Sequence, residues 1–158
     1  MNGWLIILSV ITLVGLMLSV RSCRGVPVSI SSVYYALGGN GWMFQVAALL
    51  MSFLLFPVWV SVSDPSLQYL PFIACASLAF VAVAPAFRLK LEGAVHYGAA
   101  VMCCVCTFIW QLLKGLWDIA LWFVLFGAIL TLKDWSKWCW WLECAMIGSL
   151  IGNIWRVV

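Results

Sequence analysis

The sequence predicts an all-α fold, a single domain in which six transmembrane helices form a bundle. Of the 158 residues, 66% are hydrophobic and only 8% are charged, whereas roughly a quarter of the residues in a soluble domain are charged. Long apolar runs recur along the whole chain, and the ten-residue alternation of a membrane β-barrel is absent. Because lipid leaves the polar edge of an open sheet unpaired, helices are the expected structure.

Six apolar stretches are long enough to cross roughly 30 Å of hydrocarbon, which takes about 20 helical residues. The first has neither a basic region before it nor an A-x-A-like site after it, so we expect a span rather than a signal peptide. The fifth is the shortest, and five spans plus an interfacial helix is the alternative. The expected spans cover about residues 3–20, 41–62, 67–87, 94–113, 116–132 and 138–155.

Basic residues in short loops indicate the side of the membrane, because they stay preferentially in the cytoplasm. Six of the eight follow the first, third and fifth spans: Arg21, Arg24, Arg88, Lys90, Lys133 and Lys137. We therefore expect these three loops in the cytoplasm, both termini outside, and a multi-pass protein of a bacterial inner membrane. The net charge of +3 is not gathered into a basic patch for nucleic acid.

Tryptophans and prolines mark features of the expected spans. Pro57 falls in the second span, and Pro71 and Pro85 fall in the third. A proline inside a helix removes a backbone hydrogen bond and tends to kink the helix. Amphipathic indole rings are most stable at the membrane surface. We expect seven of them to anchor span ends there: Trp4, Trp42, Trp59, Trp117, Trp135, Trp138 and Trp155.

The connector between the first two spans, RSCRGVPVSISSVYYALGGNGW from residue 21, is too polar to cross lipid. It is also too rich in apolar and aromatic residues to be a free tether. Gly38, Gly39 and Gly41 permit backbone turns that other residues resist. We expect an interfacial helix or a shallow re-entrant segment over residues 28–37 that ends at these glycines.

The third loop, RLKLEG, is expected on the same face as this connector, because the second and third spans form a hairpin. Its basic residues, with hydroxyls and glycine backbone from the connector, suit a phosphate or carboxylate, including a lipid headgroup. The alternative is ordinary interfacial anchoring with a Glu92–His96 pair, four residues apart on one helical face. The candidate ligand-binding residues are Ser29, Ser31, Ser32, Tyr34, Tyr35, Asn40, Arg88, Lys90, Glu92 and His96.

Glu143 lies about one and a half turns into the sixth expected span. An ionisable group at that depth is costly and normally faces the bundle interior, forms a pair or marks a polar path. We expect its partner on another helix, with Gln111 or Lys133 as candidates. Glu143 and Gln111 are thus the candidate intramembrane polar residues, although a later helix start would make Glu143 interfacial.

The sixth span also carries a G-x-x-x-G pattern at Gly148 and Gly152, which lets another helix approach closely. Packing within the bundle is favoured over self-association, because every helix of a small bundle must pack somewhere. Association with a second copy or another subunit through this span is the alternative. Asn153 adjoins the pattern and is a candidate for an interhelical hydrogen bond.

The cysteines and the single histidine point away from redox and metal chemistry. Most of the seven cysteines lie in apolar runs, where a thiol is a small packing residue. Cys103 and Cys106 form a C-x-x-C pair, but in mid-span, where a thiolate is disfavoured. One histidine cannot supply a histidine-rich metal shell. We therefore expect no metal and no cofactor.

The segment SISSVYYALGGNGW before one span and VHYGAA at the start of a later one resemble small uncharacterised bacterial multispanning membrane protein families. Those families have a serine-rich first loop and a histidine carried on a helix. The resemblance covers a small part of the chain and implies a fold type without a reaction. In such families the first loop can also face outside, opposite to the side that the arginines predict.

Three functions are consistent with this pattern. The leading hypothesis is that the protein binds or transports a small amphipathic or anionic ligand at a cytoplasm-facing pocket, with membrane lipid around it. The second is a non-catalytic accessory or assembly subunit that holds a partner through the sixth span. The third is a lipid-modifying enzyme with Ser31 as nucleophile, His96 as base and Glu92 as orienting acid. A non-enzymatic function is favoured.

Overall fold

The computed structural model describes residues 3–85 and 88–158, apart from the side chains of residues 19 and 21–24. The described chain is helical, without strands. Short elements are α2 (Val33–Ala36) and three 3₁₀ turns, Gly38–Asn40, Pro65–Leu67 and Trp135–Lys137. The six long helices are α1 (Gly3–Arg24), α3 (Trp42–Ser61), α4 (Tyr69–Val83), α5 (Lys90–Leu113), α6 (Trp117–Lys133) and α7 (Trp138–Val157).

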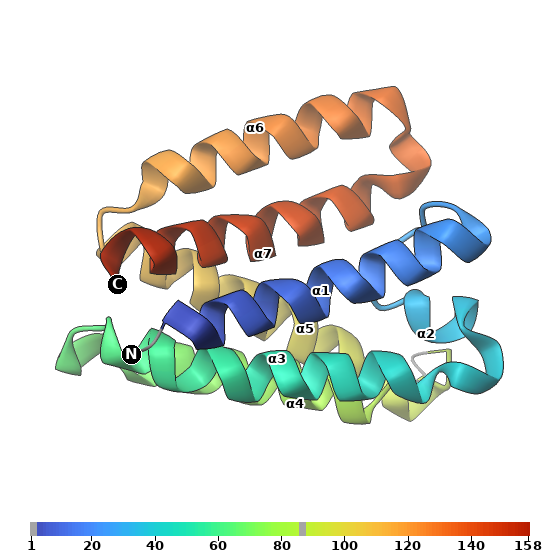
Figure 1. Ribbon diagram of the computed structural model, residues 1–158, viewed down its shortest axis with the longest axis horizontal. Coiled ribbons are helices and arrows are strands. Elements are labelled where there is room, and N and C mark those ends of the chain that lie inside the picture. Colours follow the sequence, from blue (N-terminus) through green and yellow to red (C-terminus); the bar gives the residue numbers. More distant parts are fainter. Residues whose placement is uncertain (1–2, 86–87) are drawn as a thin grey trace.

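The long helices form an antiparallel bundle. α3 packs on α4, α4 on α5, and α6 on α7, while α1 packs on α3 and α7 touches both α5 and α1. Figure 1 shows both termini at one end of the bundle, α2 at the other end, and α6 on the outside. The connectors after α1, α4 and α6 consequently share one end, as the alternation of spans predicts. The side chains of Arg21 and Arg24, on which the predicted orientation partly depends, lie outside the described residues.

Three of the described helical segments are long and apolar enough to cross a membrane: Gly38–Ser61, Pro65–Val83 and Lys90–Leu113. Gly3–Leu18 is a shorter apolar helix. These findings are compatible with a membrane protein, but six spans are not confirmed. The outer surface fits the same conclusion, because Phe53, Trp122 and Phe126 are between 61% and 72% exposed. Soluble monomers rarely expose large contiguous apolar patches.

The predicted role of Trp59 at the membrane surface is wrong. Its side chain is 1% exposed and packs edge-on against that of Trp110, with 5.5 Å between the ring centroids. Both rings belong to the larger of two hydrophobic core clusters, together with Ile6, Leu70 and Ile154. The six other expected anchors are more than half exposed, as a position at a surface requires: Trp4, Trp42, Trp117, Trp135, Trp138 and Trp155.

The helix ends show what each proline of the expected spans does. Of these three prolines, Pro57 is the one that lies beyond the first turn of a helix. Pro71 lies in the first turn of α4, where the missing N–H has no intrahelical acceptor to lose. Pro85 lies outside α4, which ends at Val83. A proline disfavours the α conformation of the residue before it, and this residue, Ala84, has a ψ of 57°. Residues 86 and 87, the end of the expected third span, lie outside the described residues.

The connector is less helical than predicted. Turns precede α2, and the helix covers only Val33–Ala36. Ser29 and Ser32 explain the turns, because each backbone N–H donates to the other's hydroxyl at 3.1 Å, which competes with helix formation. The predicted ending at the glycines is confirmed: Gly38, with a φ of +58°, begins the 3₁₀ turn that follows α2.

Candidate functional site

The expected contact between the first and third loops is present, but it is on the surface. The backbone N–H of Arg88 donates to the Tyr35 hydroxyl at 3.0 Å, and the Arg88 guanidinium carbon lies 4.2 Å from the centre of the Tyr35 ring. Lys90 is exposed at the first turn of α5, and Asn40 is exposed at the end of its 3₁₀ turn. These polar groups lie at the rim of the bundle and do not line the cavity described below.

The other candidate residues divide between local structure and the bundle interior. Ser29 and Ser32 satisfy each other, and the Tyr34 ring packs over Gly41, where an added Cβ would lie 2.8 Å from the ring. His96 is buried, with its Nδ1 2.9 Å from the carbonyl oxygen of Ala84 at the end of α4. The predicted ligand-binding site therefore combines residues that the fold places in different surroundings.

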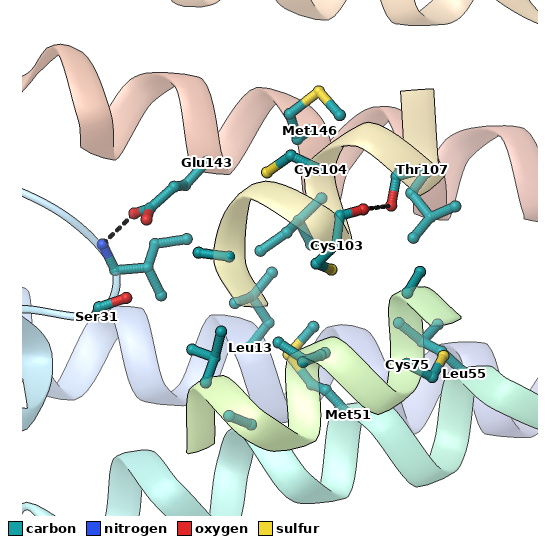
Figure 2. A pocket seen from close by; sticks show the side chains of 18 of the residues that line it. Leu13, Ser31, Met51, Leu55, Cys75, Cys103, Cys104, Thr107, Glu143 and Met146 are labelled. Atoms are coloured by element: carbon teal, nitrogen blue, oxygen red, sulfur yellow. Dashed lines mark hydrogen bonds between the residues drawn. The ribbon is translucent and has the colours of Figure 1, made fainter. Parts of the chain in front are cut away.

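A partly open cavity of about 120 Å³ lies between the helices and is lined by α1, α3, α4, α5, α7 and the connector. Figure 2 shows the helices that surround it. Most of the lining is apolar, with Leu13, Met51, Leu55 and Met146 from three different helices. The cavity extends from Ile30 and Ser31 of the connector toward Trp59 near the other end of α3.

Small side chains on facing helices account for this space. Ala47 and Ala48 on α3, Ala74 on α4 and Ala100 on α5 all line the cavity. Alanine brings helix backbones close together but leaves gaps where no larger neighbour fills the centre. The sequence analysis did not identify this cavity, although the accumulation of small residues in three apolar spans is a signal that could have indicated it. Its meaning depends on which helix faces meet, which the sequence does not state.

Glu143 is the one charged side chain in the described lining of the cavity. Its Oε2 accepts a hydrogen bond from the backbone N–H of Ile30 at 2.5 Å, and its carboxylate also contacts the thiol of Cys139. The prediction that Gln111 or Lys133 is its partner is therefore wrong, because the connector supplies the donor. A second hydrogen bond joins the connector to α7: the backbone N–H of Trp140 donates to the carbonyl oxygen of Val28 at 3.1 Å.

The other polar groups in the lining either already make a hydrogen bond or are thiols, which are weak donors and acceptors. The Thr107 hydroxyl donates to the carbonyl oxygen of Cys103, one turn earlier in α5, at 2.7 Å (Figure 2). Cys75, Cys103 and Cys104 contribute free thiols, which behave largely as small apolar groups. The C-x-x-C pair is thus part of the packing and the cavity wall. Glu143 and Ser31 supply the strongest hydrogen-bonding groups at the connector end.

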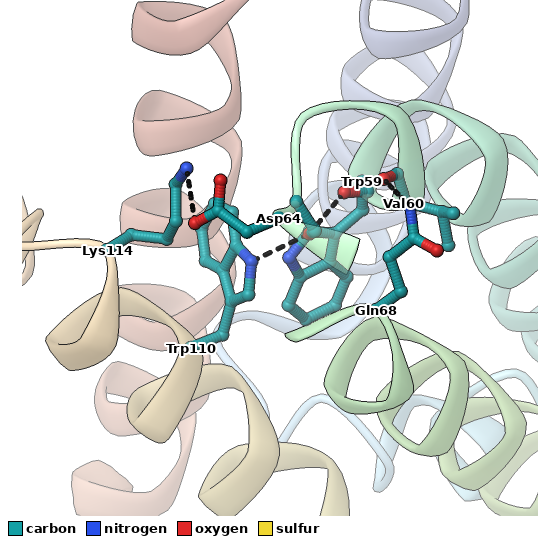
Figure 3. Close-up of polar contacts among 7 residues, drawn as sticks. Trp59, Val60, Asp64, Gln68, Trp110 and Lys114 are labelled. Carbon is teal, nitrogen blue, oxygen red and sulfur yellow. Dashed lines mark hydrogen bonds and ion pairs between the residues drawn. The ribbon is translucent and has the colours of Figure 1, made fainter. Parts of the chain in front are cut away.

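Trp59 lies at the opposite end of the cavity, and Trp110 packs against it. The Trp110 Nε1–H donates to Ser63 Oγ at 2.8 Å, and Ser63 Oγ donates to the carbonyl oxygen of Trp59 at 2.6 Å (Figure 3). At the surface of the same end, Lys114 Nζ lies 3.2 Å from Asp64 Oδ2. These contacts join the α3–α4 turn to the end of α5. They hold Trp59, which lines the cavity, in place.

The predicted helix-packing residues of α7 face α6 and α5. An added Cβ at Gly148 would lie 2.5 Å from Phe123 Cε1 of α6, so this glycine permits the close approach of the two helices. Near Gly152, Asn153 makes the expected interhelical hydrogen bond: its Nδ2 donates to Gln111 Oε1 at 2.7 Å and to Leu116 O at 2.9 Å. A partner bound through this face of α7 would have to displace α6.

The comparisons with known proteins give no relative: no protein-family model, no curated protein and no solved structure matches the chain. The class that the fold and cavity define is a helical bundle with membrane-compatible helices and a mostly apolar cavity between them. Its function therefore has to be inferred from the site.

Proposed function

We propose that the chain is a six-span inner-membrane protein that binds, or moves across the membrane, a small amphipathic molecule held in the cavity between its helices. The cavity is the observation that carries this proposal. It is lined by five helices, has a mostly apolar wall and has Glu143 and Ser31 together at the connector end. Ligand sites have the same composition, an apolar lining with a few convergent polar groups.

The size of the cavity limits the ligand. Sites for drug-sized molecules measure about 300–1,000 Å³, whereas an engineered apolar cavity of about 150 Å³ in another protein binds benzene. A cavity of about 120 Å³ suits a single ring or a short alkyl chain. The ligand would lie with its polar end near the connector and its apolar part toward Leu55 and Trp59.

The six-span arrangement is supported by the surface of α6. Leu121, Trp122, Phe126 and Leu132 are all exposed on this outer helix. A topology with only the three most apolar helices in lipid would leave these side chains in water, which is unfavourable. With α6 and α7 also in the membrane, lipid covers them, and the connectors after α1, α4 and α6 share the cytoplasmic side.

The alternatives have less support. An anionic ligand at Arg88 and Lys90 would bind at an exposed rim, where Arg88 already stacks on Tyr35. A nucleophile and base formed by Ser31 and His96 would need both in one site, yet Ser31 lines the cavity and His96 is not part of its described lining.

The proposal is tested with 1-hexanol and the chain purified in a non-ionic detergent. We expect hexanol to raise the unfolding temperature of the unmodified chain, because a ligand that binds only the folded state stabilises it. The Ala74→Leu variant should lose this shift, since leucine occupies the cavity. Ala79→Leu, on the same helix but outside the cavity lining, should keep it. An equal shift in both variants would show that hexanol binds elsewhere.

A further inference from the structure

We infer that the ligand of this cavity is a small apolar amine, whose ammonium group pairs with the carboxylate of Glu143 while its hydrocarbon part fills the space toward Leu55. This inference rests on the proposed function and names the chemical class of its ligand. It comes from three features of the cavity: the sign of its charge, the unused acceptor sites of its carboxylate, and the shape of its apolar part.

The charge in the cavity wall is negative. Glu143 lines the cavity, and no basic side chain does so in the part of the chain that the structure describes. The ion pairs among the described residues lie away from the cavity, near the ends of the bundle. They are Lys114–Asp64, Lys137–Asp134 and Arg156–Asp118. A carboxylate in apolar surroundings is costly unless it is paired. A bound cation would supply the missing charge.

The carboxylate has room for a donor. Its two oxygens can accept about four hydrogen bonds, and the structure fills two of these positions, from the Ile30 N–H and the Cys139 thiol. A primary ammonium carries three N–H donors and forms short charge-assisted hydrogen bonds with carboxylates. The hydroxyl of Ser31, buried at the same end of the cavity, is a second acceptor for such a group.

Metal ions and anions fit this site poorly. Calcium and magnesium take six or more oxygen ligands, or keep several waters, and one carboxylate beside a predominantly hydrocarbon wall offers too few. An anion would be repelled by Glu143 and would meet mainly apolar side chains further in. The remaining part of the cavity, next to Met51, Leu55 and Leu150, favours hydrocarbon.

The experiment compares hexylamine, 1-hexanol and hexanoate, which share a six-carbon chain and differ in charge. Binding is measured by thermal shift and by calorimetric titration of the detergent-purified chain. We expect hexylamine to bind the unmodified chain more tightly than hexanol by about tenfold to a hundredfold, the range for a hydrogen bond to a charged group. Hexanoate should bind more weakly than hexanol.

The informative variant is Glu143→Gln, because glutamine still accepts the hydrogen bond from the Ile30 N–H but carries no charge. It should lose the preference for hexylamine and keep hexanol binding. The matched control is Asp134→Asn, which removes a negative charge from the α6–α7 turn at the same end of the bundle and should keep the preference.

Each result separates the two proposals. Equal affinity of hexylamine and hexanol for the unmodified chain would overturn the amine inference while the cavity stays a ligand site. A preference for hexylamine that survives in Glu143→Gln would overturn it too. Binding of none of the three compounds would refute the proposed function itself. Because the first comparison needs no variant, the inference can be judged even if Glu143→Gln fails to fold.

Discussion

Filling the cavity should stabilise the protein. Ala74 on α4 is fully buried and belongs to the cavity lining, so a leucine at this position would extend its extra carbons toward the cavity. In lipid the transfer of apolar groups from water contributes little, and the cost of a cavity is mainly lost van der Waals contact. At about 24 cal/mol per Å³ of closed, empty cavity, a volume of 120 Å³ sets an upper bound of about 3 kcal/mol, because this cavity is partly open. Ala74→Leu should recover part of this.

The matched control is Ala82→Leu, eight residues along the same helix. Ala82 is also 0% exposed, but it does not line the cavity. Overpacking at such a site costs about 1–3 kcal/mol. The free energy of unfolding of both variants is measured in mixed micelles at increasing denaturing detergent. Ala74→Leu should be as stable as the unmodified chain or more stable, and Ala82→Leu should be less stable. Equal destabilisation would refute a cavity at Ala74.

Three further predictions concern the connector, the polar core and the topology. Gly41→Ala should destabilise the protein by about 1–3 kcal/mol, because its Cβ would lie 2.9 Å from a backbone oxygen; Gly39→Ala, which meets no atom within 4 Å, should cost little in the same thermal assay. Asn153→Leu leaves the oxygens of Gln111 and Leu116 without their donor and should lower the free energy of unfolding by about 1–3 kcal/mol. A double-mutant cycle with Gln111→Leu should show positive coupling, whereas additive effects would contradict the hydrogen bond between Asn153 and Gln111. In a cysteine-free chain, an impermeant thiol reagent added outside cells should label Ser66→Cys but not Gly39→Cys; the reverse pattern would invert the topology.

Much of the fold could be predicted because lipid imposes simple rules on sequence. Apolar runs and the absence of an alternating pattern indicated helices, and the helix ends fall close to the expected ones for α3 and α6. The two features that the sequence analysis placed wrongly, the end of α4 and the surface position of Trp59, have local causes. Pro85 ended α4 earlier than hydropathy alone suggests, and Trp59 is buried because Trp110 of another helix covers it.

The candidate site was only partly predictable. Glu143 stood out because an ionisable group in an apolar run is rare and costly, and it lines the cavity. Its hydrogen-bond donor is the backbone of Ile30, which residue type cannot reveal. The cavity wall comes from five helices, and its alanines look like ordinary packing residues until their relative rotation is known. Arg88 and Lys90 attracted attention by charge, although their place is at the rim.

The most direct test of the central claim is an experimental structure of the chain in lipid nanodiscs with bound 6-bromohexylamine. The account predicts ligand density inside the cavity, with the amine nitrogen within about 3 Å of a Glu143 carboxylate oxygen and the bromine toward Leu55. Density that lies only outside the bundle, or a bromine at the Glu143 end, would contradict it.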